Sequence, residues 1–162
     1  MIDKELLIRT IDRALEGTDL YLVELKLTPA NEINVEIDSD TMVDIDECVA
    51  LTRSIEDVFD REIEDYELEV GSAGLTSPLK VYRQYVKNLG KDMEVLTRDG
   101  RKLHGVLASA EQTDPVDPRA VKFELAVKTK VKEPGAKRPV IRDEKIELTA
   151  ADCKSVVYDL KF

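Results

Sequence analysis

Residues 66–79 read Y-E-L-E-V-G-S-A-G-L-T-S-P-L, and the rest of the chain can be interpreted from this stretch. Its first five residues alternate, with three apolar side chains on one face and Glu67 and Glu69 on the other. This period of two predicts a half-buried strand. The next eight residues hold two glycines, two serines and a proline, which predicts either a binding loop on a rigid base or a simple connector between domains.

Two helices and two further strands are expected before this stretch. Asp3 can cap a helix that runs to about Glu16, with Gly17 as its stop, and Asp44 with Glu47 has the spacing of a capping box. The predicted strand residues that face inward are Val23, Leu25, Leu27, Ile33, Val35 and Ile37. The predicted buried stripe of the second helix is Ile45, Cys48, Val49, Thr52, Ile55 and Phe59. The order is helix, strand, strand, helix, strand, with both helices on one face.

Short strands follow the stretch. Residues 80–88 suggest a short helix or linker, anchored by Val81, Tyr82, Tyr85 and Val86 and ended by Gly90. Asp99-Gly100 is the favoured dipeptide of a type I′ hairpin. Five strands in all, with one helical turn at residues 149–152, predict a small SH3-like or Sm-like barrel, so the fold class is α+β.

Charge is spread unevenly over the net −10 of the chain. Residues 1–89 hold 21 acids and 9 Lys/Arg, whereas residues 90–162 hold 13 acids and 15 Lys/Arg. An acidic half repels phosphate and attracts basic proteins, while a near-neutral half with local Lys/Arg clusters tolerates RNA. We therefore expect an N-terminal α/β domain at residues 1–89 and a C-terminal barrel at residues 90–162.

Enzymatic and metal chemistry find little support in the sequence. His104 is the only histidine and lies in a strand pattern, where a structural role is the commoner one. The acidic run at residues 38–47 departs from the EF-hand template, and we attribute it to the start of a helix. No metal ligand and no cofactor are expected. The two cysteines, Cys48 and Cys153, are far apart, which predicts a reducing, cytoplasmic compartment.

Basic residues cluster near the C-terminus. The candidate contacts to rRNA are Lys128, Lys130, Lys132, Lys137, Arg138 and Arg142. The alternative is a solvated strand edge that opposes aggregation. Gly71-Ser72-Ala73-Gly74 also matches the G-x-x-G of KH domains, but that loop joins two helices and here the motif follows an acidic strand.

The loop, the elements before it and the strands after it together resemble the ribosome maturation factor RimP family, whose loop reads roughly E-V-S-S-P-G-L-D-R-P-L. Seven of eleven positions match, namely Glu69, Val70, Ser72, Gly74, Leu75, Pro78 and Leu79. The resemblance implies a non-enzymatic assembly factor that binds the free small (30S) ribosomal subunit. It further implies contact with a basic small-subunit ribosomal protein near the decoding region, whereas contact with 16S rRNA is predicted from the basic cluster.

The resemblance gives the location of the loop, and the charge of the strand before it adds two carboxylates. The candidate partner-binding residues are therefore Glu67, Glu69, Gly71, Ser72, Gly74, Leu75, Pro78 and Leu79. The chain departs from the family loop at Gly71, Ala73, Thr76 and Ser77, and so lacks its Asp-Arg pair. Independently, the charge pattern predicts an exposed sheet face around Lys26 that carries Glu24, Glu36, Asp38, Glu67 and Glu69. The alternative function is an Sm-like RNA-binding regulator that acts through the barrel.

Overall fold

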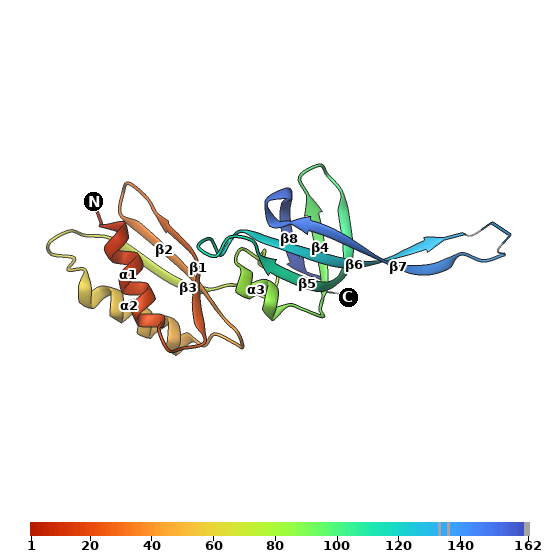
Figure 1. Ribbon diagram of the computed structural model, residues 1–162. Helices are drawn as coiled ribbons and strands as arrows, with labels where there is room; N and C mark the ends of the chain where they lie inside the picture. The colour runs from red at the N-terminus through yellow and green to blue at the C-terminus, as the bar shows by residue number, and fades with distance from the viewer. Residues whose placement is uncertain (133, 136, 161–162) are drawn as a thin grey trace. The chain divides into compact units, whose positions relative to one another are not determined.

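The computed structural model describes residues 1–132, 134–135 and 137–160, and the side chains of Lys130 and Val131 lie outside the described part. The chain divides into two compact units, Met1–Gly74 and Leu75–Phe162 (Figure 1). This division falls closer to the N-terminus than the break predicted at residues 89–90, and that break stays a prediction.

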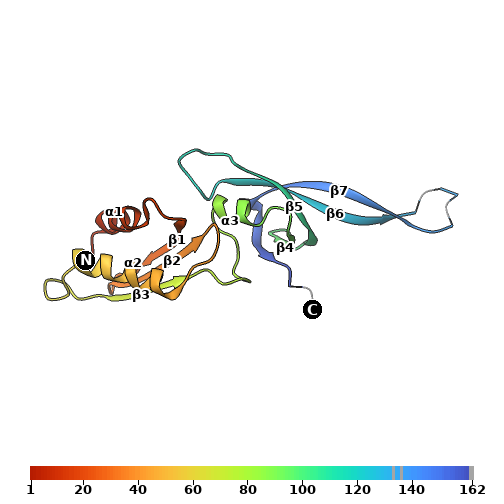
Figure 2. The same ribbon diagram turned by 90° about the horizontal axis from the view of Figure 1, so that it is seen from below.

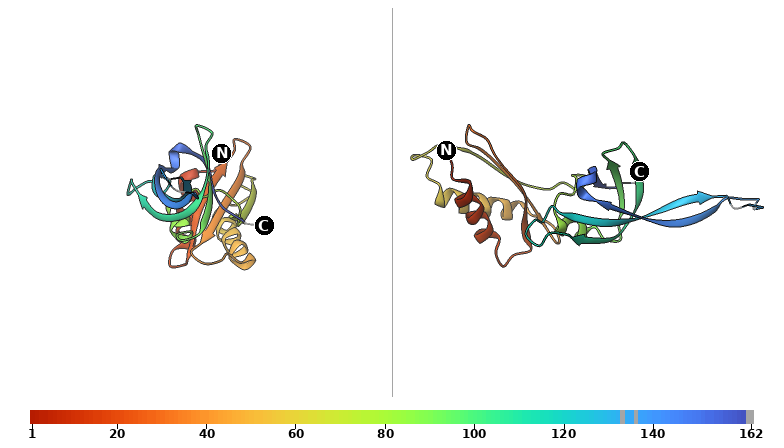
Figure 3. Two further views of the ribbon diagram at one scale, coloured as in Figure 1. Left: turned by 90° about the vertical axis from the view of Figure 1, so that its right-hand side faces the viewer. Right: turned by 45° about the horizontal axis from the view of Figure 1, so that its top comes forward.

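The first unit has the predicted order of elements. It contains α1 (Lys4–Leu15), β1 (Leu20–Leu27), β2 (Glu32–Ser39), α2 (Ile45–Val58) and β3 (Glu67–Ser72). The sheet order is β1-β2-β3, with β1 and β2 antiparallel and β2 and β3 parallel. Both helices lie on the same face of this sheet (Figure 3).

The helix ends follow the predicted capping chemistry. The Asp3 carboxylate accepts hydrogen bonds from the backbone N–H groups of Glu5 and Leu6, and Asp44 forms a complete capping box with Glu47. Gly17 has φ +76°, the left-handed conformation that ends a helix at little cost for glycine. These caps fix where both helices begin and where α1 ends.

The core of the first unit corrects two parts of the sequence prediction. A β-bulge between Leu22 and Glu24 shifts the phase of β1, so Val23 is buried but lies outside the core cluster that Leu22 and Leu25 join. On α2 the buried stripe runs through Cys48, Leu51, Ile55 and Phe59, and the sequence prediction missed Leu51. Ile45 and Val49 were predicted to be buried, but they are 81% and 41% exposed.

The second unit consists of a short helix and five strands. Its elements are α3 (Tyr82–Lys87), β4 (Asp92–Thr97), β5 (Lys102–Gln112), β6 (Val121–Val131), β7 (Val140–Thr149), the 3₁₀ turn η1 (Ala150–Asp152) and β8 (Cys153–Tyr158). They form an antiparallel sheet in the order β7-β6-β5-β4-β8. Among the described residues, no β7–β8 pairing closes this sheet into the predicted barrel.

Alternation builds the core of the second unit as predicted. Met93, Val95 and Thr97 on β4 are buried, as are Phe123 and Leu125 on β6. Tyr85 of α3 stacks on Phe123 with ring centroids 5.3 Å apart, so the short helix is anchored to this core. Val86, another predicted anchor, is instead exposed, and the sequence did not predict the burial of Gln84.

The β4–β5 turn corrects the predicted turn type. Gly100 has φ +90°, but Asp99 is not among the residues with positive φ, and type I′ needs both. The Thr97 N–H donates to Arg101 O and the Gly100 N–H to Thr97 O, as in a three-residue loop that ends on a left-handed glycine.

No helix in the described part of the chain is long and apolar enough to cross a membrane.

Candidate functional site

Acidic side chains gather on the face of the first sheet that the helices leave uncovered. Glu24 pairs in register with Glu36, and Glu32 pairs with Glu67. Asn34 lies opposite Glu69 and Lys26 on the same face. We call the following five carboxylates the acidic face: Glu24, Glu32, Glu36, Glu67 and Glu69.

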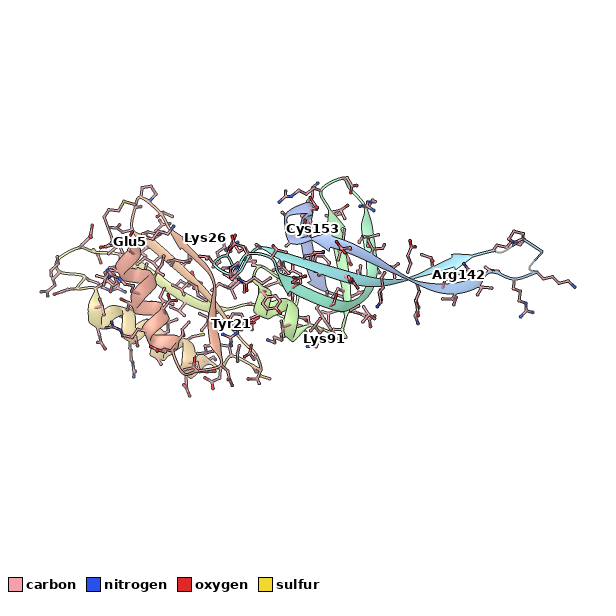
Figure 4. All side chains as sticks on the ribbon, in the orientation of Figure 1. Glu5, Tyr21, Lys26, Lys91, Arg142 and Cys153 are labelled. Atoms are coloured by element: carbon pink, nitrogen blue, oxygen red, sulfur yellow. The ribbon has the colours of Figure 1, made fainter. Side chains whose placement is uncertain are left out.

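A shallow cavity of about 230 Å³ lies on the acidic face. It is lined by Glu24, Lys26, Asn34, Val35, Glu36, Glu69, Gly71 and Ser72. The Lys26 ammonium lies 3.9 Å from the Glu24 carboxylate, and Figure 4 marks Lys26 on this sheet. One lysine among five carboxylates leaves the face strongly negative. Its exposed charges, on Glu32, Glu67 and Glu69, act mainly over long range.

The residues on the acidic face differ from the predicted set at two positions. Asp38 is only 8% exposed, and its carboxylate accepts a hydrogen bond of 2.8 Å from the Ser39 N–H. It therefore does not contribute to the exposed charge. Glu32, which the sequence analysis left out, is exposed and lies opposite Glu67. The parallel β2–β3 register was the missing information, because it aligns these two residues.

The predicted loop begins at the end of β3. Gly71 and Ser72 belong to that strand, and the Ala73 N–H donates to Ile37 O at 2.9 Å. A side chain at Gly71 would meet nothing within 4 Å, and its φ is not positive, so the backbone there does not require glycine. The Gly-x-x-Gly sequence follows a strand and does not join two helices, so the KH alternative is wrong.

The structure divides the predicted partner-binding residues between the two units. Glu67, Glu69, Gly71, Ser72 and Gly74 belong to the first unit. Leu75, Pro78 and Leu79 belong to the second unit, where the Leu79 N–H donates to Val156 O at 2.8 Å. Leu79 also packs against the second core, whereas Leu75 is 68% exposed. Leu79 thus has a structural role in the second unit.

The basic cluster lies on a two-stranded extension of the second sheet. The pairing of β6 with β5 ends at Ala126, but β6 continues to pair with β7 as far as Val131 and Val140. We call residues 127–132 and 137–144 the basic ribbon; Figure 1 shows it projecting from the second sheet, and Figure 4 marks Arg142 on it. Its exposed cations are Lys128, Lys132, Lys137, Arg138 and Arg142. The side chain of Lys130 lies outside the described part of the chain.

Only one side-chain cluster in the described residues has the composition of a metal site. Glu94, His104 and Asp159 come from β4, β5 and the end of β8, and their ligand atoms lie within 4.8 Å of one another. Both carboxylates have partners in the chain, because His104 Nδ1 lies 3.1 Å from Asp159 and Lys102 Nζ lies 3.2 Å from Glu94. These contacts link β4 to β5 and β5 to the residue after β8, and the structural role of His104 stays a prediction.

The two thiols are poor nucleophiles. Burial raises the pKa of the Cys153 thiol, and the nearby Asp152 carboxylate raises it further. Burial likewise raises the pKa of the Cys48 thiol, with Glu47 and Asp44 adding to the shift. Since the thiolate is the reactive form, neither cysteine is prepared for covalent chemistry.

Comparison with known proteins gives consistent results over almost the whole chain. The family model described as RimP N-terminal domain matches residues 10–76. The "Ribosome maturation factor RimP" of Porphyromonas gingivalis strain W83 is 45% identical over 157 residues, which cover 97% of this chain and 98% of that protein. The protein of the same name from Flavobacterium psychrophilum is 32% identical over 135 residues, 83% of each chain. That from Christiangramia forsetii is 40% identical over 99 residues, 61% of this chain and 64% of that protein.

Proposed function

The chain belongs to the RimP family of ribosome maturation factors, and from this premise we propose that it binds the free small (30S) ribosomal subunit while that subunit matures. The observation that carries the proposal is the 45% identity over 97% of the chain. Family membership identifies a non-enzymatic assembly factor and favours this function over the Sm-like RNA-binding regulator.

The acidic face and the start of the loop dock a basic small-subunit ribosomal protein near the decoding region. Support comes from the charge of the face, where Glu24, Glu36 and Glu69 line one cavity with Lys26, and from the exposure of Glu67 and Glu69. Ser72 and Gly74 are exposed just beyond these carboxylates, so one partner could touch both. Ribosomal proteins are strongly basic, whereas bare rRNA would be repelled by such a face.

The basic ribbon contacts 16S rRNA. Residues 128–142 hold six Lys/Arg and one acid in an otherwise acidic chain. Five of these cations are exposed on a hairpin that no second layer packs against in the described part of the chain. A hairpin of this kind can reach phosphates without rearranging a core, and phosphate contacts supply most of the sequence-independent affinity for RNA.

The second unit forms an SH3-like (Sm-like) barrel, and the protein acts in the cytoplasm. The barrel is supported by the sheet order, because β8 pairs with β4 and so brings the last strand of the unit beside its first. The sequence break at residues 89–90 is retained as the domain boundary. Limited proteolysis tests it, since a first cut at residues 85–91 supports that boundary and a first cut at residues 74–79 supports the division of the compact units.

Co-sedimentation in a sucrose gradient tests the function as a whole. The purified chain should migrate with free small subunits and be absent from the fractions that hold complete ribosomes. A chain that stays at the top of the gradient with free small subunits present, at low and at physiological salt, would contradict the proposal. Binding to naked RNA by the second unit without any subunit binding would favour the RNA-binding regulator.

A further inference from the structure

The outer edge of β3 is an open strand edge. The Glu67 N–H donates to Asn31 O at 3.0 Å and the Ala73 N–H donates to Ile37 O at 2.9 Å, so the odd-numbered residues of β3 turn their backbone groups toward β2. Because backbone groups alternate along a strand, Leu68, Val70 and Ser72 turn theirs the other way. In the described part of the chain β3 pairs with β2 alone.

One end of this edge is capped inside the protein. Arg61 donates to the Tyr66 carbonyl at 2.9 Å and also lies over the Tyr66 ring, 4.5 Å from its centroid. The cap stops there, because no described hydrogen bond reaches the backbone groups of Leu68, Val70 or Ser72. These residues therefore present a ready template for one more strand.

An apolar flank of α2 lies on the same side of the unit. Ser54 and Val58 line a groove between α2 and α1. Ile45 and Val49 lie roughly 140–180° around the helix from those two residues, at 3.6 residues per turn. Since α1 contacts β1 while α2 contacts β3, this second flank faces the β3 side of the sheet, as the position of α2 in Figure 2 illustrates.

The exposure of this flank explains the error in the sequence prediction. Ile45 and Val49 have the spacing of a buried stripe, yet they are 81% and 41% exposed. Nothing in the first unit covers them. In a parallel strand-helix-strand unit the helix runs back along the sheet, so the start of α2 lies near Val70 and Ser72 at the end of β3. A strand added there would have an apolar surface below it and acids above it.

We propose that an extended basic segment of the partner adds to β3 as a fourth strand, with its cations over the acidic face and its alternate apolar side chains against Ile45 and Val49. The inference rests on the proposed function and names the mode of binding for the same site. Backbone pairing supplies affinity in such complexes, and alternate side chains supply selectivity. Here the outward side chains meet Glu67 and Glu69, which selects lysine or arginine at every second position.

A synthetic peptide of alternating lysine and valine tests the mode of binding with the full chain. Amide exchange measured by NMR should show slow exchange at Glu69 and Gly71 in the free protein and fast exchange at Leu68, Val70 and Ser72. On binding, the second group should slow by about tenfold or more, as expected for new backbone hydrogen bonds. A peptide with the same residues in two blocks, and one of alternating glutamate and valine, are the controls. Binding without protection of these amides, or equal binding of the block peptide, would overturn the inference.

Variants test the same mode on free small subunits. Ser72→Pro removes an N–H from the open edge, and Ser72→Ala removes the hydroxyl but keeps that N–H. Ser72→Pro should bind about tenfold more weakly than Ser72→Ala, because both variants lack the hydroxyl and only Ser72→Pro also lacks the N–H. Ile45→Lys with Val49→Lys should also weaken binding, and Ile63→Lys, at a site 86% exposed, is the matched control.

The outcomes separate this inference from the proposed function. If the parent does not bind free small subunits, the proposed function fails. If the parent binds, and Ser72→Pro and the α2 double variant bind equally well with unchanged melting temperatures, only the strand addition is wrong. Should Ser72→Pro lower the melting temperature, the α2 double variant and the amide exchange decide the question, because both leave the backbone of β3 intact.

Discussion

The acidic face and the basic ribbon are the two charged regions of the molecule, and they are built in opposite ways. The acidic face lies on a sheet whose other side is packed by both helices through buried residues such as Leu7, Ile11 and Ile55. The ribbon is a pair of strands in which residues 140–145 of β7 are all exposed. The charged residues of the face therefore lie on a sheet backed by a core, while most charged residues of the ribbon lie on a strand pair that extends beyond the second core.

This difference indicates which substitutions should change binding to the subunit without changing the stability of the fold. Surface substitutions away from packed groups usually alter stability by no more than about 0.5 kcal/mol, so changes on the ribbon should act on binding alone. At the base of the ribbon, where β6 leaves β5, the backbone is instead tightly packed.

Gly105→Ala should destabilise the second unit severely. A Cβ at Gly105 would lie 2.4 Å from Ala126 O, at the point where the ribbon leaves the sheet. Overpacking of this kind costs about 1–3 kcal/mol or more, and contact with a backbone atom places this case at the upper end. The melting temperature should fall by roughly 10 °C.

The same substitution at Gly71 is the matched control. Gly71 lies next to the last residue of β3, beside the acidic face, and a Cβ there would meet nothing within 4 Å. The free energy of unfolding of Gly71→Ala should lie within about 0.5 kcal/mol of that of the parent. If the two alanine variants have equal melting temperatures, β5 and β6 separate easily at Gly105. The base of the ribbon would then not be tightly packed.

Charge reversal on the ribbon should have the next largest effect. Replacing Lys132, Lys137, Arg138 and Arg142 by Glu removes up to four phosphate contacts. Affinity for free small subunits should fall on the order of tenfold or more, and the slope of log affinity against log salt should shrink by as much as about 3. The thermal melt should not move. Lys91→Glu with Lys154→Glu is the control in the same unit. If the ribbon variant keeps the salt slope of the parent, the ribbon does not contact phosphates and is only a solvated strand edge.

The order and periodicity of elements were predictable because local chemistry determines them. Asp3, Asp44 with Glu47, and Gly17 mark helix ends through hydrogen bonds within a few residues of sequence. Alternation on β4 and β6 likewise reports burial directly, as at Met93 and Leu125. The bulge after Leu22 and the left-handed Gly100 turn could not be read in this way, because several conformations suit the same residues.

The negative charge of the candidate site could be predicted from the sequence, but not all of the residues that form it. Glu67 and Glu69 are exposed as their alternation predicted, but Asp38 is buried and Glu32 joins the face. Glu32 joins the face through its pairing with Glu67 on β3, while Asp38 pairs with Tyr21 on β1, and both pairings are long-range properties. The exposure of Ile45 could not be predicted from helical periodicity, since apolar spacing looks the same whether the chain or a partner covers it.

Reversal of the acidic face should have a smaller effect than reversal of the ribbon. Glu67→Lys with Glu69→Lys should slow association with free small subunits by roughly 3–10-fold at low salt, because exposed charges mainly steer encounter. The difference should shrink as salt rises. Asp57→Lys with Glu62→Lys makes the same charge change on exposed residues elsewhere in the unit. If both pairs slow association equally, net charge and not the face is responsible.

The smallest effect on stability is expected from the loss of one carboxylate in each unit. The Thr97 hydroxyl donates to Asp99, and this hydrogen bond, with help from Arg101, holds the pKa of Asp99 below its ordinary value of 3.8. In the first unit, contact with the N-terminal ammonium holds the pKa of Glu64 below 4.5. A lowered folded-state pKa means that each group stabilises the fold above its ordinary pKa and loses that contribution as pH falls through the lowered value.

Asp99→Asn and Glu64→Gln should therefore each melt slightly below the parent at pH 7, and the gap should close as the pH falls below about 4. Differential scanning calorimetry at pH 7 and pH 3 measures both gaps. Asp114→Asn makes the same chemical change at an exposed loop carboxylate and serves as the control. A gap for Asp99→Asn that stays constant down to pH 3 would show that the turn depends on the geometry of the side chain at residue 99. The charge of Asp99 would then contribute nothing to holding β4 against β5, and the contrast between the units would rest on packing alone.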